Sequence, residues 1–139
     1  MQQEIRLATF NVRNLVLPDT AYYDDLAAYT HDEYEAKTEW IAKKIDQSDA
    51  DVIGFQEIFS KKALEQKSRL YRDAELICFD QNNPPATLKP QVALLTRLPL
   101  AGSPQSHKTF PRQFEITLPI TETVINQFSR PVLEAPVLL

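Results

Sequence analysis

Glycine is scarce in this chain: only Gly54 and Gly102 occur among its 139 residues. Loops that cradle a phosphate with backbone N–H groups need several glycines at short fixed spacings, as in the dinucleotide-binding fingerprint and the Walker loop. Two glycines so far apart in the sequence cannot build either loop. The scarcity therefore excludes these two classes of nucleotide-binding protein.

Cysteine and long apolar runs are also rare. The single Cys78 excludes an internal disulfide framework and a cysteine-rich zinc site, and its apolar neighbours predict a buried side chain. No apolar run approaches the length that a membrane span requires. The first residues, MQQEIRL, lack the basic and apolar regions of a signal peptide. We therefore expect a cytoplasmic protein with no membrane span.

Basic residues are outnumbered by acidic ones, 15 to 19, which gives a formal net charge of −4. This balance argues against a protein that wraps nucleic acid by electrostatics alone. It is compatible with an enzyme that holds phosphate through a metal ion, because the cation supplies the positive charge. The length suits one domain with one sizeable core.

The hydrophobic pattern predicts an α/β fold that becomes antiparallel. Strand and helix signals alternate in the first part of the chain, and only strand signals follow. We expect strands over residues 4–10, 51–57, 74–80, 91–97, 113–120 and 130–139, and helices over 32–47 and 61–73. Residues 13–31 and 81–90 carry loop signals. Pro99, Pro104 and Pro111 predict an irregular section after residue 97, with His107 in an irregular loop.

The helix over 32–47 has the clearest signals. Thr30 or Asp32 can cap its N-terminus, and acidic residues crowd its first turns. Tyr34, Ile41 and Ile45 recur on one face. This spacing predicts the side of the helix that packs against the core.

Two of the expected strands end in polar residues that suit metal chemistry. Asn11 follows the first strand, and the apolar run of 52–55 leads to Glu57. Ligand sites of layered α/β proteins gather at the carboxyl ends of strands. A carboxylate there suits Mg²⁺, and an asparagine can orient a water or a phosphate oxygen without adding charge. The pair therefore suits metal-assisted phosphate hydrolysis. The alternative to a catalytic role is that Asn11 forms a turn and Glu57 is a solvated side chain.

Two motifs resemble a known superfamily. ATFNVRNL at 8–15 and DVIGFQEIF at 51–59 are similar to the first two motifs of the endonuclease/exonuclease/phosphatase (DNase I-like) superfamily. Three further segments resemble its bacterial nuclease-like branch, in the same order: YTHDEYEAKTEWIAKKI at 29–45, QVALLTRLPL at 91–100 and FSRPVLEAPVLL at 128–139. The resemblance therefore extends over nearly the whole chain.

The resemblance implies a four-layer α/β sandwich, in which two mixed sheets pack face to face with helices outside. It also implies hydrolysis of phosphoesters that depends on Mg²⁺ or Mn²⁺. By position, Glu57 would be the metal ligand, and Asn11 would hold the metal-water network or the phosphate; both would be catalytic. Arg13 stands where the branch often has an acid, and we assign it no role.

Other catalytic groups of the superfamily have no counterpart here. The superfamily also uses a histidine near the middle of the domain, an Asp-x-Asn pair and a closing Asp-His pair, on strands that would follow Leu139. We expect His31 and His107 to be surface residues, and Asp80-Gln81-Asn82 to be a turn. Residues 1–139 then correspond to the N-terminal portion of one domain, incomplete and inactive as an isolated segment.

Half of a sandwich would expose a large apolar surface, which monomers avoid. We therefore expect a homodimer or a complementary C-terminal half as a partner. The expected substrate is a phosphoester, with nucleic acid as one candidate. Two alternatives stay open: a non-catalytic remnant or interaction module, and a phosphomonoesterase that acts on small-molecule or lipid phosphates.

Overall fold

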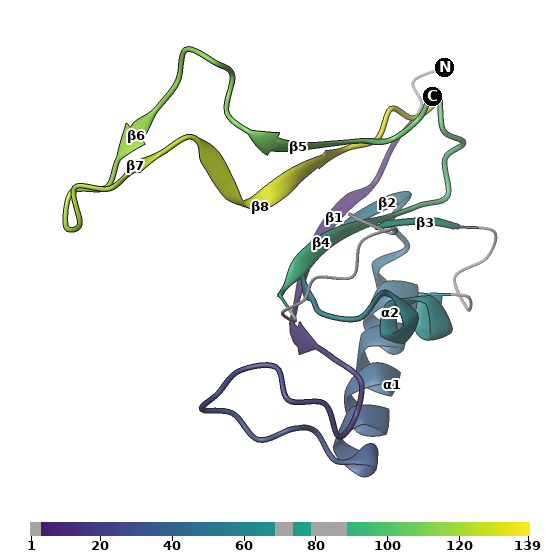
Figure 1. Ribbon diagram of the computed structural model, residues 1–139. Helices are drawn as coiled ribbons and strands as arrows, with labels where there is room; N and C mark the ends of the chain where they lie inside the picture. Colours follow the sequence, from purple (N-terminus) through teal and green to yellow (C-terminus); the bar gives the residue numbers. More distant parts are fainter. Residues whose placement is uncertain (1–3, 69–73, 79–88) are drawn as a thin grey trace.

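A mixed four-stranded sheet with two helices on one side forms the centre of the molecule (Figure 1). The computed structural model describes residues 4–68, 74–78 and 89–139. In these ranges the elements are β1 (Leu7–Leu15), α1 (His31–Ser48), β2 (Val52–Ile58), α2 (Lys61–Ser68), β3 (Glu75–Cys78), β4 (Gln91–Thr96), β5 (Gln105–Thr109), β6 (Ile116–Thr117), β7 (Val124–Ile125) and β8 (Gln127–Glu134).

The strands of the central sheet lie in the order β1-β2-β4-β3. β1 and β2 are parallel and joined through α1, whereas β4 is antiparallel to both β2 and β3. This arrangement confirms the prediction of an α/β fold that becomes antiparallel. Among the described residues, no helix is long and apolar enough to cross a membrane.

The core lies between the sheet and the helices. Ile53 and Phe55 of β2 are 1% exposed, and the apolar face predicted for α1 is buried at Tyr34, Ile41 and Ile45. Thr38 is buried on the same helix, where its hydroxyl donates to the Glu35 carbonyl at 3.1 Å. Since this bond satisfies the hydroxyl, the core tolerates a polar residue that the apolar pattern did not predict.

Thr30, and not Asp32, caps α1. The Glu33 backbone N–H donates to Thr30 Oγ1 at 3.2 Å, and the Thr30 backbone N–H donates to Glu33 Oε2 at 2.9 Å. These reciprocal bonds form a capping box, which satisfies donors that the helix itself leaves unpaired. The helix ends at Asp49, whose backbone is left-handed with φ 45°.

β1 is longer than the sequence predicts. The strand was predicted to stop at Asn11 and a loop to begin at residue 13, but β1 continues to Leu15. Pairing with β2 resumes at Leu15 and Ile58, and the Phe59 N–H donates to the Leu15 carbonyl at 2.9 Å. The buried Leu15 stabilises this extension, so the loop begins only after it.

Three predictions for the second half of the chain were wrong. Residues 105–109 were assigned to an irregular stretch but form β5, which pairs with β8. The strand predicted over 113–120 is reduced to β6, which forms a short ladder with β7. The last strand covers Gln127–Glu134 and not 130–139, because its early residues pair with β5 and Pro136 follows its end.

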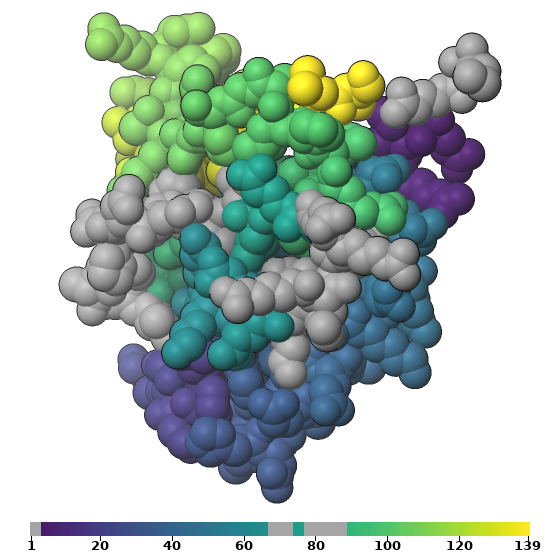
Figure 2. Space-filling model, turned by 90° about the vertical axis from the view of Figure 1, so that its right-hand side faces the viewer, coloured from purple at the N-terminus to yellow at the C-terminus, as the bar shows by residue number. Residues whose placement is uncertain are grey.

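β5 and β8 form a ribbon on the side of the sheet away from the helices (Figure 1). β8 lies against β4, with a pocket of about 190 Å³ between β8 and the strands β2 and β4. The tip that carries β6 and β7 extends beyond the body, and Figure 2 shows this light-green tip projecting at the upper left. Large apolar side chains are exposed along the ribbon and tip: Phe114, Ile116, Leu118, Ile120, Val124, Phe128 and Val132.

Four predicted features lie partly or wholly outside the described residues. The loop predicted over 81–90 is described only at residues 89–90. The helix predicted over 61–73 is described only to Ser68, and the strand predicted over 74–80 only to Cys78. The backbone of Cys78 pairs with Ala93 in the sheet. Asp80-Gln81-Asn82, expected to be a turn, lies wholly outside the described residues.

Candidate active site at the carboxyl ends of β1 and β2

Asn11 and Glu57 meet at the carboxyl ends of two adjacent parallel strands. Asn11 Nδ2 donates a hydrogen bond to Glu57 Oε1 at 2.8 Å. Asn11 lies in β1 and Glu57 in β2, and 46 positions separate them in the chain. The structure thus brings together the two residues that the sequence analysis selected as candidates for catalysis and metal binding.

An irregularity in strand pairing places the Glu57 carboxylate. Asn11 pairs with Gln56, and the next pair is Leu15 with Ile58. Residues 12–14 of β1 therefore lie opposite the single residue Glu57. Such bulges bend a strand and redirect its side chains, and they are frequent beside active sites.

Left-handed backbone conformations accompany this bulge. Arg13 has φ 51°, Asn14 has φ 61° and Glu57 has φ 62°. Each such conformation at a residue other than glycine costs on the order of 1–2 kcal/mol, so surrounding contacts must hold it. Three of them in one small region indicate a backbone fixed by its tertiary contacts and not by local preference.

A backbone bond fixes the orientation of the Asn11 amide. The Arg13 N–H donates to Asn11 Oδ1 at 2.8 Å, which leaves Nδ2 to face Glu57. Within the described residues, the second carboxylate oxygen, Glu57 Oε2, accepts no hydrogen bond. One oxygen of Glu57 is therefore held by Asn11, and the other is open to a cation or a water.

Gln56 and Thr9 extend the polar surface along β1 and β2. Gln56 Nε2 donates to Thr9 Oγ1 at 3.0 Å and to the Gly54 carbonyl at 3.2 Å. Thr9 and Asn11 are two residues apart in one strand, so their side chains point to the same face of the sheet. This is the face opposite the one that packs against α1, since the alternate residue Phe10 contacts Trp40 of that helix.

Lys37 holds the bulge from the side of α1. Its Nζ donates to the Arg13 carbonyl and, at 2.7 Å, to the Tyr29 hydroxyl, and lies 4.7 Å from the centre of the Tyr29 ring. Burial lowers the pKa of Lys37, and the positive charge of Arg13 acts in the same direction, whereas Glu57 opposes both. Lys37 was not among the site residues predicted from the sequence. Its spacing from Tyr34 and Ile41, three and four positions, was the available signal for a lysine on the inward face.

The residues present fit a loosely held magnesium ion better than a fully protein-ligated one. Among residues 4–68, 74–78 and 89–139, no group of three histidine, cysteine, aspartate or glutamate side chains is placed to hold a metal. Magnesium commonly keeps several waters and uses one or two carboxylates together with substrate phosphates. Glu57, with its open Oε2, offers one such carboxylate.

The two histidines form exposed pairs with carboxylates. His31 Nε2 lies 3.1 Å from Asp19 Oδ2, and His107 Nε2 lies 2.7 Å from Glu134 Oε2. The predicted surface location of both is therefore confirmed, because the side chains are 76% and 46% exposed. The surroundings predicted for His107 were wrong, since it lies in β5 and not in an irregular loop.

Arg97, in the segment that resembles the family's strand ending in arginine, lies at the opposite end of the sheet. Its guanidinium contacts Asp49 and Asp51 at 3.1 Å each. These contacts join the end of β4 to the turn between α1 and β2. Arg97 therefore has a structural role distant from the ends of β1 and β2 that carry Asn11 and Glu57.

Comparison of the chain with protein-family models, with curated proteins and with solved structures finds no match. The structure itself defines a mixed α/β protein in which polar residues converge at the carboxyl ends of two parallel strands.

Proposed function

We propose that this chain is the metal-holding portion of a phosphoester hydrolase that depends on a divalent metal, of nuclease or phosphodiesterase type. The observation that carries the proposal is the hydrogen bond of 2.8 Å between Asn11 Nδ2 and Glu57 Oε1 at adjacent strand ends. The resemblance of both surrounding motifs to the endonuclease/exonuclease/phosphatase superfamily supports the same assignment.

Each residue of the pair has a distinct role in this proposal. Glu57 would hold Mg²⁺ or Mn²⁺ through Oε2, the oxygen that Asn11 leaves open. Asn11 orients the carboxylate and presents an uncharged amide beside the site. The bound ion would polarise the phosphoryl group and stabilise its developing charge. Arg13 and Lys37 place further positive charge near the bulge, which favours an anionic substrate.

The β5–β8 ribbon supports the further proposal of a second sheet and a partner. The ribbon and its tip expose seven large apolar side chains, among them Ile120 at 95% and Phe114 at 57%. Large exposed apolar patches mark interaction sites. We propose that a second copy or a complementary segment covers the ribbon and completes a four-layer sandwich.

Catalysis in this proposal belongs to the completed assembly. The histidine, Asp-x-Asn and Asp-His groups that the superfamily uses would come from a complementary segment, because a second copy of this chain lacks them. A second candidate function, a non-catalytic interaction module of the same fold, is favoured by the same exposed apolar ribbon, since such a surface binds a partner whether or not a metal is present.

Thermal unfolding with and without Mg²⁺ tests the metal assignment. A ligand at 100 times its dissociation constant stabilises the folded state by about 2.7 kcal/mol, so Mg²⁺ is expected to raise the Tm of the wild-type chain. Glu57→Gln should lose this increase. Glu39→Gln, at an exposed carboxylate on α1, is the matched control and should keep it. An equal increase in all three proteins would overturn the proposal.

A further inference from the structure

A pocket opens beside Asn11 at the free edge of β1. It has a volume of about 410 Å³ and lies between β1 and α1. Its lining residues are Asn11, Val12, Arg13, Lys37, Trp40 and Ile41. The lining contains two cationic residues and no carboxylate, although the chain as a whole has a net charge of −4. The lining of the pocket is therefore positively charged, although the chain is acidic overall.

The two cations lie close enough to influence each other. The charge of Arg13 acts on Lys37 in the direction that lowers its pKa, as expected for like charges in proximity. Lys37 Nζ donates to the Arg13 carbonyl and to the Tyr29 hydroxyl, which leaves one of its three N–H groups. Within the described residues Arg13 forms no ion pair. An anion in the pocket would relieve the repulsion and accept the remaining donors.

Trp40 adds a flat apolar wall. The residue is 53% exposed, so part of its indole ring is accessible to a ligand. Its ring meets the edge of Phe10 with 5.8 Å between ring centres, and Lys44 Nζ lies 5.7 Å from its centre. Lys37, Trp40 and Lys44 follow one another at helical spacings of three and four and so share one face of α1.

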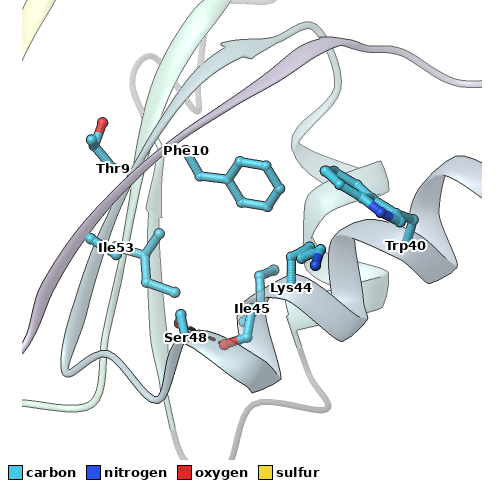
Figure 3. A pocket seen from close by; sticks show the side chains of 8 residues that line it. Thr9, Phe10, Trp40, Lys44, Ile45, Ser48 and Ile53 are labelled. Carbon is cyan, nitrogen blue, oxygen red and sulfur yellow. Dashed lines mark hydrogen bonds between the residues drawn. The ribbon is translucent and has the colours of Figure 1, made fainter.

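Trp40 separates this pocket from a second one. The neighbouring pocket, of about 240 Å³, lies between β1 and α1, and its mostly apolar lining also includes Thr9, Lys44 and Ser48 (Figure 3). Figure 3 shows Phe10 and Trp40 projecting into the space between the strand and the helix, with Lys44 beside the indole. Trp40 therefore lines both pockets, and Lys44 lies beside its ring.

We propose that Arg13, Lys37 and Trp40 form a binding site for a phosphate ester whose other group is planar and aromatic, such as one nucleotide unit. The cations would hold the phosphate and the indole would stack on the ring. Stacking on an aromatic side chain combined with phosphate contacts is the general mode by which proteins bind unpaired nucleotides. A phosphate without a ring would leave Trp40 unused.

The position of the site connects it to Glu57. Asn11 both lines the pocket and donates to the Glu57 carboxylate. The proposed nucleotide site therefore shares Asn11 with the proposed metal site, and this connection rests on the proposed function. Binding of the nucleotide unit itself requires no metal and can be tested separately.

The fluorescence of Trp40, the chain's single tryptophan, reports directly on this pocket. The titration uses adenosine 5′-monophosphate in the presence of EDTA, with adenosine and inorganic phosphate as separate probes. We expect the monophosphate to change the fluorescence saturably and to bind about tenfold more tightly than either fragment. Equal affinity for inorganic phosphate would overturn the proposed role of Trp40, and no saturable change would overturn the site.

Variants separate the site from the overall fold. Arg13→Gln removes an exposed charge and should weaken binding about fivefold or more, and Lys37→Met should weaken it similarly. Lys43→Met, on α1 outside the pocket, should bind as wild type. Circular dichroism confirms folding, and the Arg13 variant decides the outcome if Lys37→Met unfolds. Wild-type affinity in Arg13→Gln would contradict the proposal.

Glu57→Gln distinguishes this inference from the proposed function. It should bind the monophosphate normally in EDTA while losing the Mg²⁺ effect on Tm. Loss of the Mg²⁺ effect together with normal binding in Arg13→Gln would support the metal assignment and reject the nucleotide site. Weak monophosphate binding by Arg13→Gln, together with an unchanged Mg²⁺ effect on the Tm of Glu57→Gln, would support the nucleotide site and reject the metal assignment.

Discussion

The carboxamide of Asn11 donates to the carboxylate of Glu57 across two parallel strands whose pairing changes register between them. Three residues of β1 lie opposite one residue of β2 at this point, and left-handed backbone at Arg13, Asn14 and Glu57 accompanies the change. The contact thus depends on a specific backbone path, which Lys37 of α1 holds in place.

Removal of the Asn11 side chain should destabilise the fold. Asn11→Ala deletes the donor to Glu57 and the acceptor of the Arg13 N–H. Each such bond contributes about 1 kcal/mol, so we expect a loss of about 1–2 kcal/mol in the free energy of unfolding, measured in urea. Asn126→Ala, at an exposed position between β7 and β8, is the control and should change little. Equal stability of the two variants would show that the contact contributes nothing.

Lys37 should give the stability a dependence on alkaline pH. Burial lowers the pKa of Lys37 below its ordinary value of 10.5, so the unfolded chain binds this proton more tightly than the folded chain. The free energy of unfolding should therefore rise with pH as the pH passes from the folded pKa toward 10.5. The pKa values of Tyr22 and Tyr34 are raised by burial from 10.0, and these residues act in the opposite direction above that pH.

Urea unfolding across this range tests the assignment to Lys37. The rise should be present in the wild-type chain and in Lys43→Met, which lacks an exposed lysine of the same helix. It should be absent in Lys37→Met. A rise of the same size in Lys37→Met would assign the effect to another group.

The capping box should determine the stability of α1 and its response to acid. Thr30→Ala removes the side-chain acceptor of the Glu33 N–H and should lower the free energy of unfolding by about 1 kcal/mol.

Hydrogen bonds from Thr30 lower the pKa of Glu33 below 4.5. The stabilisation by the Glu33 carboxylate is therefore complete above pH 4.5 and is lost as the pH falls through the pKa of Glu33 in the folded chain. Glu33→Gln should show a weaker acid transition by circular dichroism, whereas Glu39→Gln should follow the wild type.

The exposed apolar side chains of the ribbon and its tip should drive association. Ile116, in β6 of the tip, is 50% exposed, so Ile116→Lys should fold normally yet reduce self-association or partner binding. Sedimentation velocity should show assembly of the wild-type chain and a shift of the variant toward monomer. Leu7→Lys, at an exposed apolar residue of β1 outside the ribbon, is the control. A monodisperse, fully folded wild-type monomer would contradict the proposal of a covered ribbon.

The local pattern of apolar residues correctly predicted those helices and strands whose apolar residues pack into the central core. α1 and β2 lie within one residue of their predicted bounds, because their apolar spacing and the capping signal at Thr30 agree with the final packing. The end of β1 was not predictable in this way. Left-handed Arg13 and Asn14 depend on a lysine 24 positions away from Arg13, which no local pattern encodes.

In the second half of the chain, too, local sequence patterns could not predict structure that depends on distant contacts. β5 contains only exposed residues, so it lacks the alternation that identifies a strand and exists through its pairing with β8. The proximity of Asn11 and Glu57 was predictable, because adjacent parallel strands bring their carboxyl ends to one edge. The hydrogen bond itself was not, since it requires the bulge opposite Glu57.

Electron paramagnetic resonance of free Mn²⁺ tests the central claim, that Glu57 holds a divalent metal, most directly. The signal of the free ion is measured during titration into wild-type, Glu57→Gln and Glu39→Gln proteins. We predict saturable binding of one ion by the wild type and the Glu39 variant, and a loss of affinity of at least about tenfold in Glu57→Gln. Equal Mn²⁺ binding by wild type and Glu57→Gln would contradict the account.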